Sequence, residues 1–573
     1  MSDISKDMTR PAVGIFSPLA LLLLVLAVLA LLLSLRLVVP IGPMYWDTYI
    51  YLDAAQRLKM GQIPAVDFLA PVGALDYYQF YWLQRLFPNG QPTLLAQWSA
   101  LIFAAPIMAV IVWDVDKRSR GIAFALLIPF LIFAICPTNT QSFHSYPGIS
   151  GFGIYNRHTS LLLYVLTSAL IFLPNTRKLA IVAALAMLAL FFTKITGFLA
   201  GGLIGLFAIL SGRFKWRHVL LAMIVVIVAL LIFELNHRMV STYLASIIEL
   251  VGMNQGVLLS RFLTVFSTKL DVILAAAALI LFLFWINRSN VAAVLKKLAS
   301  QPSTKAVATV LDQDFLWIGV VLVAGIFLET QNTGSQEFIF LWPVLLALIV
   351  KSATLPESHR LIVYVLVAFT AIPTLTKVMH ESLRMTAVAP TYVAAPVTDV
   401  KSMGLVSTRK DIWERVDLLE AHYVKNAATY RELAEQGQLP SWQLYSELDY
   451  QMFWLVSADR AVKAIKQFEA TNGVHLNSLM NLDFTNPFPW ILDRDATRHI
   501  QIGADPFRTV GTLTSEEEAA VRATDGVLRP SCPMTTARLM LWKVYEKALD
   551  DRTVVKLNEC WDLLLRPGVA STK

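Results

Sequence analysis

The sequence predicts an α-helical polytopic membrane protein with a small mixed α/β soluble domain at its C-terminal end. Two observations lead to this prediction. The 573 residues are 56% hydrophobic and 16% charged, whereas about a quarter of a soluble domain is charged. Apolar runs of about 17 to 25 residues recur between Leu19 and Met379, and each could cross roughly 30 Å of hydrocarbon. Mixed, less apolar patterns follow Met379.

The transmembrane part is expected to hold about 11 helices, one for each apolar run. The first run, Phe16 to Val39, follows a short basic segment and could be mistaken for a secretory signal. It is too long for a signal core of about 7 to 15 residues, so we expect it to remain as a helix. The approximate centres of the runs are Val25, Ile102, Leu127, Leu166, Ala186, Ile204, Val226, Leu279, Val321, Leu345 and Val367.

Lysine and arginine residues predict the orientation of these helices. They gather in alternate connecting loops, and loops enriched in this way face the cytoplasm. With an odd helix count, the C-terminal domain then lies on the extracytoplasmic side. The net charge of +7 mainly reflects this bias, and no nucleic-acid partner is expected. The basic residues on the cytoplasmic side are Lys6, Arg10, Lys117, Arg118, Arg120, Arg177, Lys178, Arg213, Lys215, Arg217, Arg288, Lys296, Lys297, Lys305, Lys351 and Arg360.

Composition divides the chain into three parts. Residues 1–380 form the transmembrane domain with a large first external loop at 40–92, residues 381–406 form a linker, and residues 407–573 form the α/β domain. The linker is rich in Ala, Pro, Val and Thr, which indicates an extended connector. In the α/β domain, periodicity predicts helices at Asp411 to Gln436, Asp459 to Ala470 and Thr535 to Asp550, and strands at Ser478 to Phe484, His499 to Ile502 and Thr553 to Leu557.

Two cysteines of the C-terminal domain, Cys532 and Cys560, lie where the topology predicts an oxidising space. A disulfide between them would close a loop of about 28 residues and contribute roughly 3 kcal/mol. Two unpaired buried thiols explain the sequence equally well, so the pairing stays open. The cysteines and histidines form no cluster at zinc-binding spacing. No metal and no cofactor is therefore expected.

The first external loop departs most from a plain pattern of helices and short connections. Loops without secondary structure are uncommon beyond about 15 residues. Helical spacing predicts two interfacial helices, Trp46 to Met60 and Val72 to Phe87, with Tyr and Trp side chains at the level of the lipid headgroups. The loop contains the stretch MYWDTYIYLDAAQRLKMGQIPAVDFLAPVGALDYYQFYWLQRLFPNG.

This loop resembles the first external loop of GT-C type glycosyltransferases, in its early Asp followed by AAQRLKMGQIP, VDF and PVGAL. Other similar stretches are YNRH (Tyr155 to His158), FTKITG (Phe192 to Gly197), ETQNTGSQEF and NLDFTNPFPW (Asn481 to Trp490). The chain is thus similar to the bacterial mannosyl/arabinosyl-transferase-like superfamily. The resemblance implies an inner-membrane enzyme that transfers a hexosyl or pentosyl group, with inversion, from a polyprenyl-phosphate donor to a lipid or polysaccharide acceptor.

The resemblance also implies a general base in the first loop, and Asp47 occupies that place. A carboxylate suits the chemistry because the acceptor hydroxyl loses its proton as the new C–O bond forms. Alternatively, Asp47 caps the helix that begins there. Asp53 points about 120° away from Asp47 on the same helix, and a surface ion pair with Arg57 is expected there. Contact with the acceptor and bracing of the loop are both open for Asp53 and Asp67.

The leaving phosphate needs cations at the same membrane face. Lys194 is the first candidate, because a lysine among apolar helices costs about 2.5 to 3.5 kcal/mol to insert. Snorkelling of its amine to the headgroups is the alternative. Arg157 and His158 of YNRH and Arg261 are further candidates for binding the donor phosphate, and Lys269 is a weaker one.

Two classes of function fit the sequence. The first is an enzyme that glycosylates a lipid or polysaccharide, and the second is a membrane transporter or a scaffold that binds envelope polymer. Transporters often have paired halves, and this sequence has no internal repeat, which favours the enzyme. The acidic pairs of WDVD (Trp113 to Asp116) and DQD (Asp312 to Asp314) fall in cytoplasmic loops, so we expect solvated charges there. GISGFG (Gly148 to Gly153) does not follow a strand and is expected to be a flexible loop.

Overall fold

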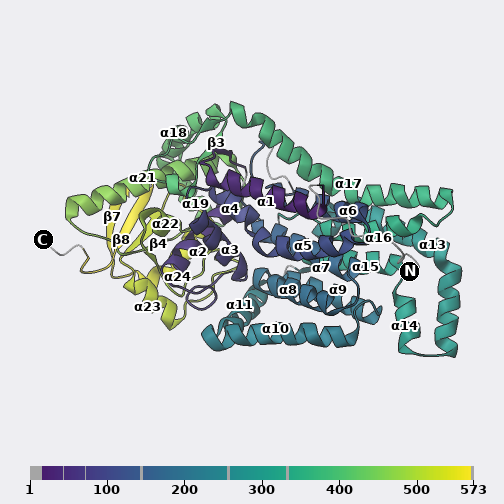
Figure 1. Ribbon diagram of the computed structural model, residues 1–573. Helices are drawn as coiled ribbons and strands as arrows, with labels where there is room; N and C mark the ends of the chain where they lie inside the picture. Colours follow the sequence, from purple (N-terminus) through teal and green to yellow (C-terminus); the bar gives the residue numbers. More distant parts are fainter. Residues whose placement is uncertain are drawn as a thin grey trace.

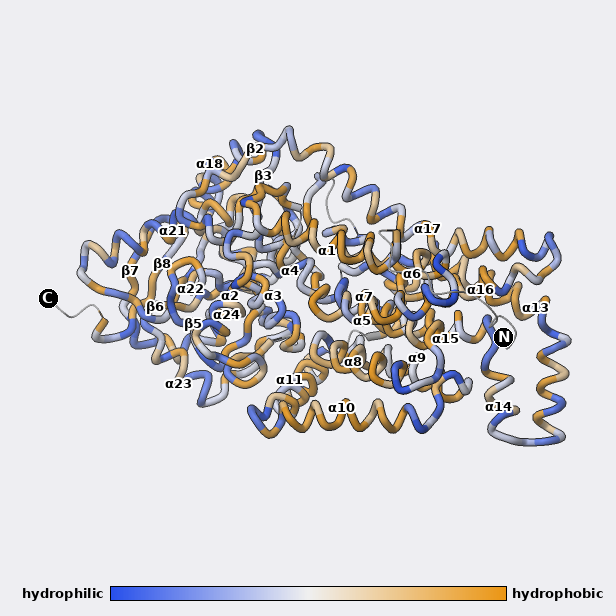
Figure 2. Tube along the Cα trace, in the orientation of Figure 1, coloured by the Kyte–Doolittle hydropathy of each residue, from blue (hydrophilic) through white to orange (hydrophobic). Residues whose placement is uncertain are grey.

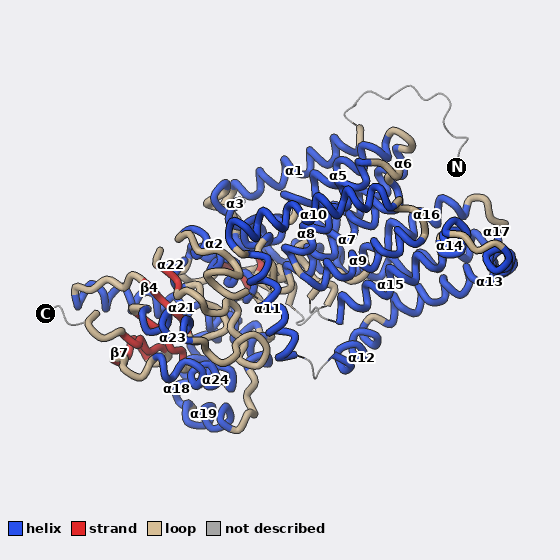
Figure 3. The backbone as a smooth tube through the Cα atoms, turned by 90° about the horizontal axis from the view of Figure 1, so that it is seen from below, coloured by secondary structure: helices blue, strands red, loops and turns tan. Residues whose placement is uncertain are grey.

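A computed structural model describes residues 16–42, 44–70, 72–141, 146–254, 258–330 and 334–569. Lys6, Arg10 and residues 331–333 of the ETQNTGSQEF stretch lie outside the described residues. Most helices of the first two thirds of the chain pack together at one end of an elongated molecule, and the C-terminal residues form the other end together with α2 (Trp46–Lys59) (Figure 1). All strands of the larger sheet lie in that C-terminal part (Figure 3).

The helical part is built from apolar segments that bend or break often. Its helices are α1 (Pro18–Ser34), α4 (Pro92–Ser99), α5 (Leu101–Asp116), α6 (Arg120–Ile135), α7 (Ile154–Phe172), α8 (Arg177–Thr193), α9 (Ile195–Leu210), α10 (Trp216–His237), α11 (Met239–Asn254), α12 (Leu258–Thr268), α13 (Leu270–Ser300), α14 (Thr304–Leu311), α15 (Asp314–Thr330), η2 (Ile339–Leu341), α16 (Trp342–Ser352) and α17 (Glu357–Val388).

The chain is a multi-pass membrane protein, although the expected count of 11 spans is not confirmed. In the part of the chain that the structure describes, four helices are long and apolar enough to cross a membrane, or up to six if each bent pair is one span. Four shorter apolar helices, α1, α6, α9 and the segment Ile339–Ser352, fall below that length. The break between α8 and α9 falls at Lys194, between the runs centred on Ala186 and Ile204.

Burial separates helices that face protein from helices that face lipid. Helix α7 is buried from Asn156 to Leu170. Helix α10 is apolar along its length (Figure 2), yet Ala222 is its only residue classed as buried. An apolar helix surface that protein does not cover requires hydrocarbon around it. Helix α10 therefore faces the lipid, and α7 occupies the middle of the helical part.

The first external loop holds the two predicted helices, α2 (Trp46–Lys59) and α3 (Leu75–Leu86). The prediction that both lie at the headgroups is wrong for α2, because the C-terminal domain covers it. Trp46 and Tyr49 are at most 2% exposed, and Tyr49 stacks on Trp454 of the domain at 5.1 Å. On α3, Trp82 remains 49% exposed, as expected for an interfacial anchor.

The C-terminal domain is a mixed α/β unit, as predicted. Its larger sheet has the order β5-β4-β6-β8-β7, with β4 parallel to β5 and β6 and the remaining pairs antiparallel. Its elements are η4 (Lys401–Met403), α18 (Lys410–Lys425), α19 (Ala427–Glu435), α20 (Ser441–Tyr445), α21 (Leu448–Asn472), β4 (Ser478–Asn481), α22 (Phe488–Leu492), β5 (Asp495–Ala496), α23 (Ser515–Ala523), β6 (Gly526–Pro530), α24 (Thr536–Tyr545), η5 (Glu546–Ala548), β7 (Thr553–Asn558) and β8 (Trp561–Leu565).

The predicted extended linker, residues 381–406, is extended only in part. Helix α17 continues to Val388, η3 (Ala389–Thr391) follows, and β2 (Val393–Ala394) and β3 (Val406–Thr408) then pair with β1 (Val39–Pro40) in a small sheet of order β1-β3-β2. The strand predicted at His499 to Ile502 is also wrong, since only an isolated bridge joins Leu69 to Gln501. The former linker pairs with β1 at the start of the first loop, and Gln501 bridges to Leu69 within that loop. Local sequence patterns cannot predict such contacts between distant segments.

Cys532 and Cys560 form a disulfide, so the alternative that the sequence left open is resolved. The bridge joins the segment after β6 to the turn between β7 and β8. Both residues are buried, at 5% and 2% exposure. The bridge therefore fixes the hairpin of β7 and β8 to the strand on which it packs.

Candidate active site

Asp47 lies in the first turn of α2 and points away from solvent. It is 4% exposed, and its carboxylate accepts a hydrogen bond of 2.8 Å from the backbone N–H of Gly153. Gly153 adopts a left-handed φ of 68° at the start of α7, a conformation that glycine reaches without strain. The helix cap is Tyr45 and has no side-chain bond. The alternative that Asp47 caps its own helix is therefore wrong.

The surroundings of Asp47 raise the pKa of its carboxyl towards the physiological pH range. Burial raises the pKa of this carboxyl from 3.8 to about 6, while the Gly153 bond and the positive charges of Arg157 and Lys194 draw it back down. Above that pH the ionised form prevails. An ionised carboxylate close to neutral pH and shielded from water is a competent general base.

Lys194 lies at the break between α8 and α9, where the backbone is extended. Its Nζ donates to Asn156 Oδ1 at 2.8 Å and lies 4.8 Å from the centre of the Tyr155 ring. Burial, followed by the nearby charge of Arg508, lowers the pKa of this amine to about 7. The amine is therefore held against two residues of α7, which does not fit snorkelling towards the headgroups.

The side chains of Arg157 and His158 both form hydrogen bonds with other groups of the protein. The Arg157 guanidinium donates to Gln97 at 2.7 Å and to the backbone carbonyls of Ser150 and Phe152. The two ring nitrogens of His158 lie 2.9 Å from Asp76 and 3.1 Å from the Gln97 carbonyl. These contacts leave little capacity for a ligand, so both residues position the loop around Asp47.

Asp76 is a site residue that sequence reasoning missed. Its Oδ2 accepts from the Tyr51 hydroxyl at 3.1 Å and faces the His158 ring, and its Oδ1 accepts from Thr193, directly before Lys194. One buried carboxylate thus joins α2, α3, α7 and the break after α8. The one sequence signal for Asp76 is its position just after PVGAL, in the loop that resembles the first external loop of GT-C type glycosyltransferases.

Asp53 and Asp67 have structural partners. Asp53 pairs with Arg57 at 2.9 Å as expected, but the side chains are 3% and 0% exposed, so the prediction of a surface pair is wrong. Asp67 accepts from the Ile63 N–H at 2.8 Å and pairs with Arg498 at 3.2 Å. Asp67 therefore braces the loop against the C-terminal domain.

A cluster of cations lies on the same side as Lys194, and it includes Arg508, which the sequence did not single out. The charge of Arg508 acts on both Lys194 and Arg261. The Arg508 carbonyl accepts from Asn254 at the end of α11 at 3.2 Å, which brings the C-terminal domain against the membrane helices. Among the described residues, no ion pair neutralises Arg508 or Arg261.

The weaker candidates have other roles. Lys269 forms a buried ion pair of 2.8 Å with Glu337, so its charge is already compensated. Among the acidic pairs excluded by sequence, Asp116 pairs with Arg120 and Asp314 with Lys351. The described residues contain no group of three or more His, Cys, Asp or Glu side chains placed to hold a metal ion.

Comparisons with known proteins find two solved structures of low similarity to this chain. No protein-family model matches the chain, and no curated protein does. Two solved structures of ArnT from Cupriavidus metallidurans match over 97% of this chain and 99% of theirs: the apo state at 12% identity and a TM-score of 0.40, and the form bound to undecaprenyl phosphate at 11% and 0.37. At such TM-scores the two matches carry no argument about this chain.

Proposed function

We propose that this protein is an inverting glycosyltransferase of the bacterial inner membrane. It takes a hexosyl or pentosyl group from a polyprenyl-phosphate donor and transfers it to a lipid or polysaccharide acceptor at the extracytoplasmic face. The supporting observation is the buried Asp47 carboxylate, whose pKa of about 6 responds to the positive charges of Arg157 and Lys194. A base beside cations is the arrangement that transfer from a phosphate ester needs.

In the proposed reaction Asp47 acts on the acceptor hydroxyl, and the cations act on the donor phosphate. Asp47 removes the proton of the acceptor hydroxyl while the hydroxyl oxygen bonds to the anomeric carbon of the sugar. The bond between that carbon and the phosphate oxygen breaks on the opposite face, which inverts the configuration. Polyprenyl phosphate leaves as a monoester with one more negative charge, and the proton stays on Asp47 until solvent removes it.

The cations stabilise the leaving phosphate. Lys194 and Arg508 come from different parts of the chain, and the charge of Arg508 lowers the pKa of the Lys194 amine. A phosphate monoester between them would relieve their mutual repulsion and gain charge-assisted hydrogen bonds. Because the negative charge grows as the phosphate leaves, these contacts strengthen towards the transition state, which is how binding energy lowers a barrier.

The C-terminal domain completes the site in this proposal. It covers α2 through hydrogen bonds from Tyr45 and Trp46 to Gln451 and Tyr445, both at 3.0 Å. The cover closes the face of α2 that carries Trp46 and Tyr49, and Arg508 adds charge from the same domain. Since basic loops predict the opposite ends of the helices to be cytoplasmic, we place the domain outside the cytoplasm.

Purified protein in nanodiscs, supplied with radiolabelled polyprenyl-phosphate sugars and an envelope extract as acceptor, tests this proposal. Asp47→Asn keeps a hydrogen-bond acceptor for Gly153 but cannot take a proton, so transfer should fall by about 10² to 10⁴. The matched control is Asp417→Asn, at a carboxylate that is 80% exposed. Unchanged transfer in Asp47→Asn would remove the assigned base.

The donor site has its own test. Lys194→Ala should weaken binding of the labelled donor by about tenfold or more, as expected for one charge-assisted contact. Lys410→Ala, where the side chain is 77% exposed, is the control and should bind normally. Movement of intact lipid across the bilayer with no sugar transferred would instead indicate a transporter.

A further inference from the structure

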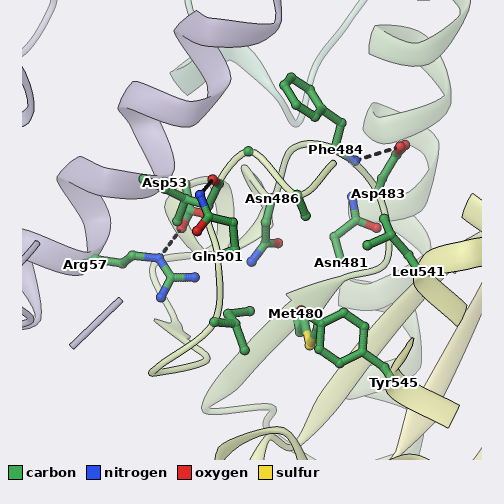
Figure 4. A pocket seen from close by; sticks show the side chains of 14 residues that line it. Asp53, Arg57, Met480, Asn481, Asp483, Phe484, Asn486, Gln501, Leu541 and Tyr545 are labelled. Atoms are coloured by element: carbon green, nitrogen blue, oxygen red, sulfur yellow. Dashed lines mark hydrogen bonds and ion pairs between the residues drawn. The ribbon is translucent and has the colours of Figure 1, made fainter. Parts of the chain in front are cut away.

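A set of charged side chains open to a partner lies at the end of the molecule opposite the C-terminal domain. The pocket between α2 and that domain, by contrast, is closed (Figure 4). Arg57 pairs there with Asp53 at 2.9 Å, and the two side chains are 0% and 3% exposed. Polar groups buried in this way are out of reach of a ligand, whereas the opposite end leaves its charges uncovered.

The charges at that end belong to a pair of helices. The end of α13, from Asn287 to Ser300, contacts α14, and we call residues 287–311 the basic hairpin. Figure 1 shows α14 running across the direction of α10, away from the C-terminal domain. Helix α14 is also bent by 73° from α15, the helix that follows it.

The orientation of α14 places it along a membrane surface. Helix α10 has 22 residues, about 33 Å of helix, and its apolar side chains face the lipid, so its axis crosses the bilayer. A helix that runs across this direction lies near the plane of the membrane. With 8 residues, α14 is also too short to span the hydrocarbon itself.

Aromatic side chains mark the membrane boundary at the base of the basic hairpin. Trp285 is 52% exposed, and the guanidinium of Arg288 lies 5.3 Å from the centre of its ring. Trp216, the first residue of α10, is 64% exposed, and the Arg217 guanidinium lies 5.8 Å from its ring centre. Exposed tryptophan beside basic residues is typical of the level of the lipid headgroups. The basic hairpin therefore begins where the hydrocarbon ends.

The other end of the basic hairpin is held at the same level. Asp312 directly follows α14 and pairs with Arg213 at 2.6 Å. It also accepts a hydrogen bond of 2.9 Å from the indole of Trp317, which is 1% exposed. Arg213 lies in the turn between α9 and α10, shortly before Trp216. Both ends are thus fixed at the membrane boundary, which keeps the basic hairpin close to the surface.

The basic hairpin carries four positive charges and no negative one. They belong to the exposed side chains of Arg288, Lys296, Lys297 and Lys305. No Asp or Glu occurs between Asp271 and Asp312. In the part of the chain that the structure describes, none of these four side chains forms an ion pair. Clusters of four or more Lys and Arg on helices next to a membrane span are typical of binding to anionic lipids.

Apolar side chains remain uncovered beside these charges. Leu295 of α13 is 48% exposed, and Val307 of α14 is 39% exposed. Val291, Val294 and Leu298 recur at i, i+3 and i+7 and are half-buried, so protein covers only one face of the helix. Lysines beside apolar side chains on the open face are typical of a helix that lies in the membrane interface. A soluble polyanion would match the charges but leave the apolar side chains in water.

We infer that the basic hairpin binds the headgroups of anionic phospholipids at the membrane surface away from the C-terminal domain. The lysine ammonium groups contact lipid phosphates, and Leu295 and Val307 enter the headgroup layer. The basic loops predict this surface to be the cytoplasmic one. Lipid binding here is independent of the proposed glycosyl transfer, because α2 with Asp47 lies at the opposite end of the molecule (Figure 1).

Hydrogen–deuterium exchange of the full chain in nanodiscs measures this contact. Nanodiscs of phosphatidylcholine alone are compared with nanodiscs of phosphatidylcholine and phosphatidylglycerol in equal parts. Backbone amides of the basic hairpin should exchange at least about tenfold more slowly with the anionic lipid, because lipid contact opposes local opening. In Lys296→Gln/Lys297→Gln/Lys305→Gln the difference should disappear, since each lysine near an anionic surface contributes about fivefold.

Three exposed lysines of the C-terminal domain provide the matched control. Lys410→Gln/Lys425→Gln/Lys463→Gln removes the same amount of charge and should keep the wild-type difference in the basic hairpin. Exchange of the buried helix α7 should be equal in all three proteins, so that a lost difference in the hairpin variant cannot be ascribed to misfolding.

Equal exchange of the basic hairpin in the two kinds of nanodisc, or an undiminished difference in the hairpin variant, overturns the lipid site. Heparin added to the phosphatidylcholine nanodiscs tests the other class of partner. Protection by heparin as strong as that by phosphatidylglycerol would assign the basic hairpin to a soluble polyanion instead. None of these measurements needs a sugar donor, so their outcome leaves the proposed transferase untouched.

Discussion

Burial of the Asp47 carboxylate should cost stability, and Asp47→Asn should recover it. The pKa of about 6, against an ordinary value of 3.8, corresponds to about 3 kcal/mol at roughly 1.4 kcal/mol per pKa unit. Because the folded pKa is the higher one, the ionised group destabilises the fold. The cost is absent well below pH 3.8, grows between pH 4 and pH 6, and is complete above pH 6.

Thermal unfolding in detergent micelles at two pH values measures this effect. At pH 8 Asp47→Asn should be more stable than the wild type by up to about 3 kcal/mol, and at pH 4.5 by about 1 kcal/mol. The control Asp417→Asn changes an exposed carboxylate and should show no such dependence. A variant that is less stable at pH 8, or a gain that does not shrink in acid, would refute the electrostatic reasoning.

The same titration predicts the activity profile, and three other changes follow from contacts described above. Transfer should rise about tenfold per pH unit below pH 6, as Asp47 ionises, and fall again above pH 7, as Lys194 loses its charge, which a rate profile measures. Arg508→Ala should raise the donor KM about tenfold with little change in unfolding temperature. Asp483→Ala leaves Arg538, paired at 2.6 Å, buried without its carboxylate, and should cost about 3 to 5 kcal/mol in chemical denaturation. Reduction of the Cys532 to Cys560 bridge, with a separation of 28, should cost about 3 kcal/mol, and an unchanged melting curve under reductant would contradict this.

Sequence patterns predicted the architecture well where the signal is local. The helix expected at Trp46 to Met60 is α2, Trp46–Lys59, and the mixed domain after the membrane helices is present. Asp47 was singled out because the first external loop resembles that of GT-C type glycosyltransferases, which implies a general base at this place. Its hydrogen bond to Gly153 could not be predicted, since the GISGFG glycines were interpreted as a flexible loop.

What sequence patterns missed depends on contacts between distant segments. An amphipathic helix has the same sequence pattern whether its apolar face packs on lipid or on protein. The sequence therefore could not show that the C-terminal domain covers Trp46 and Tyr49. Arg508 carries no motif, and its charge matters only because the fold brings it to Lys194. Asp76 appears in sequence as one acidic residue among aromatics, whereas in the structure its carboxylate joins four segments.

The small sheet in which Val39 pairs with Val406 has a consequence for how the protein matures. A ribosome delivers the membrane helices and α2 long before it delivers β3, so the newly made chain waits with Trp46 and Tyr49 uncovered. Only when β3 joins β1 can the C-terminal domain settle on α2 and bring Arg508 to Lys194. A chain interrupted before residue 406 therefore lacks the strand that pairs with Val39 and leaves the aromatic side chains of α2 without their cover.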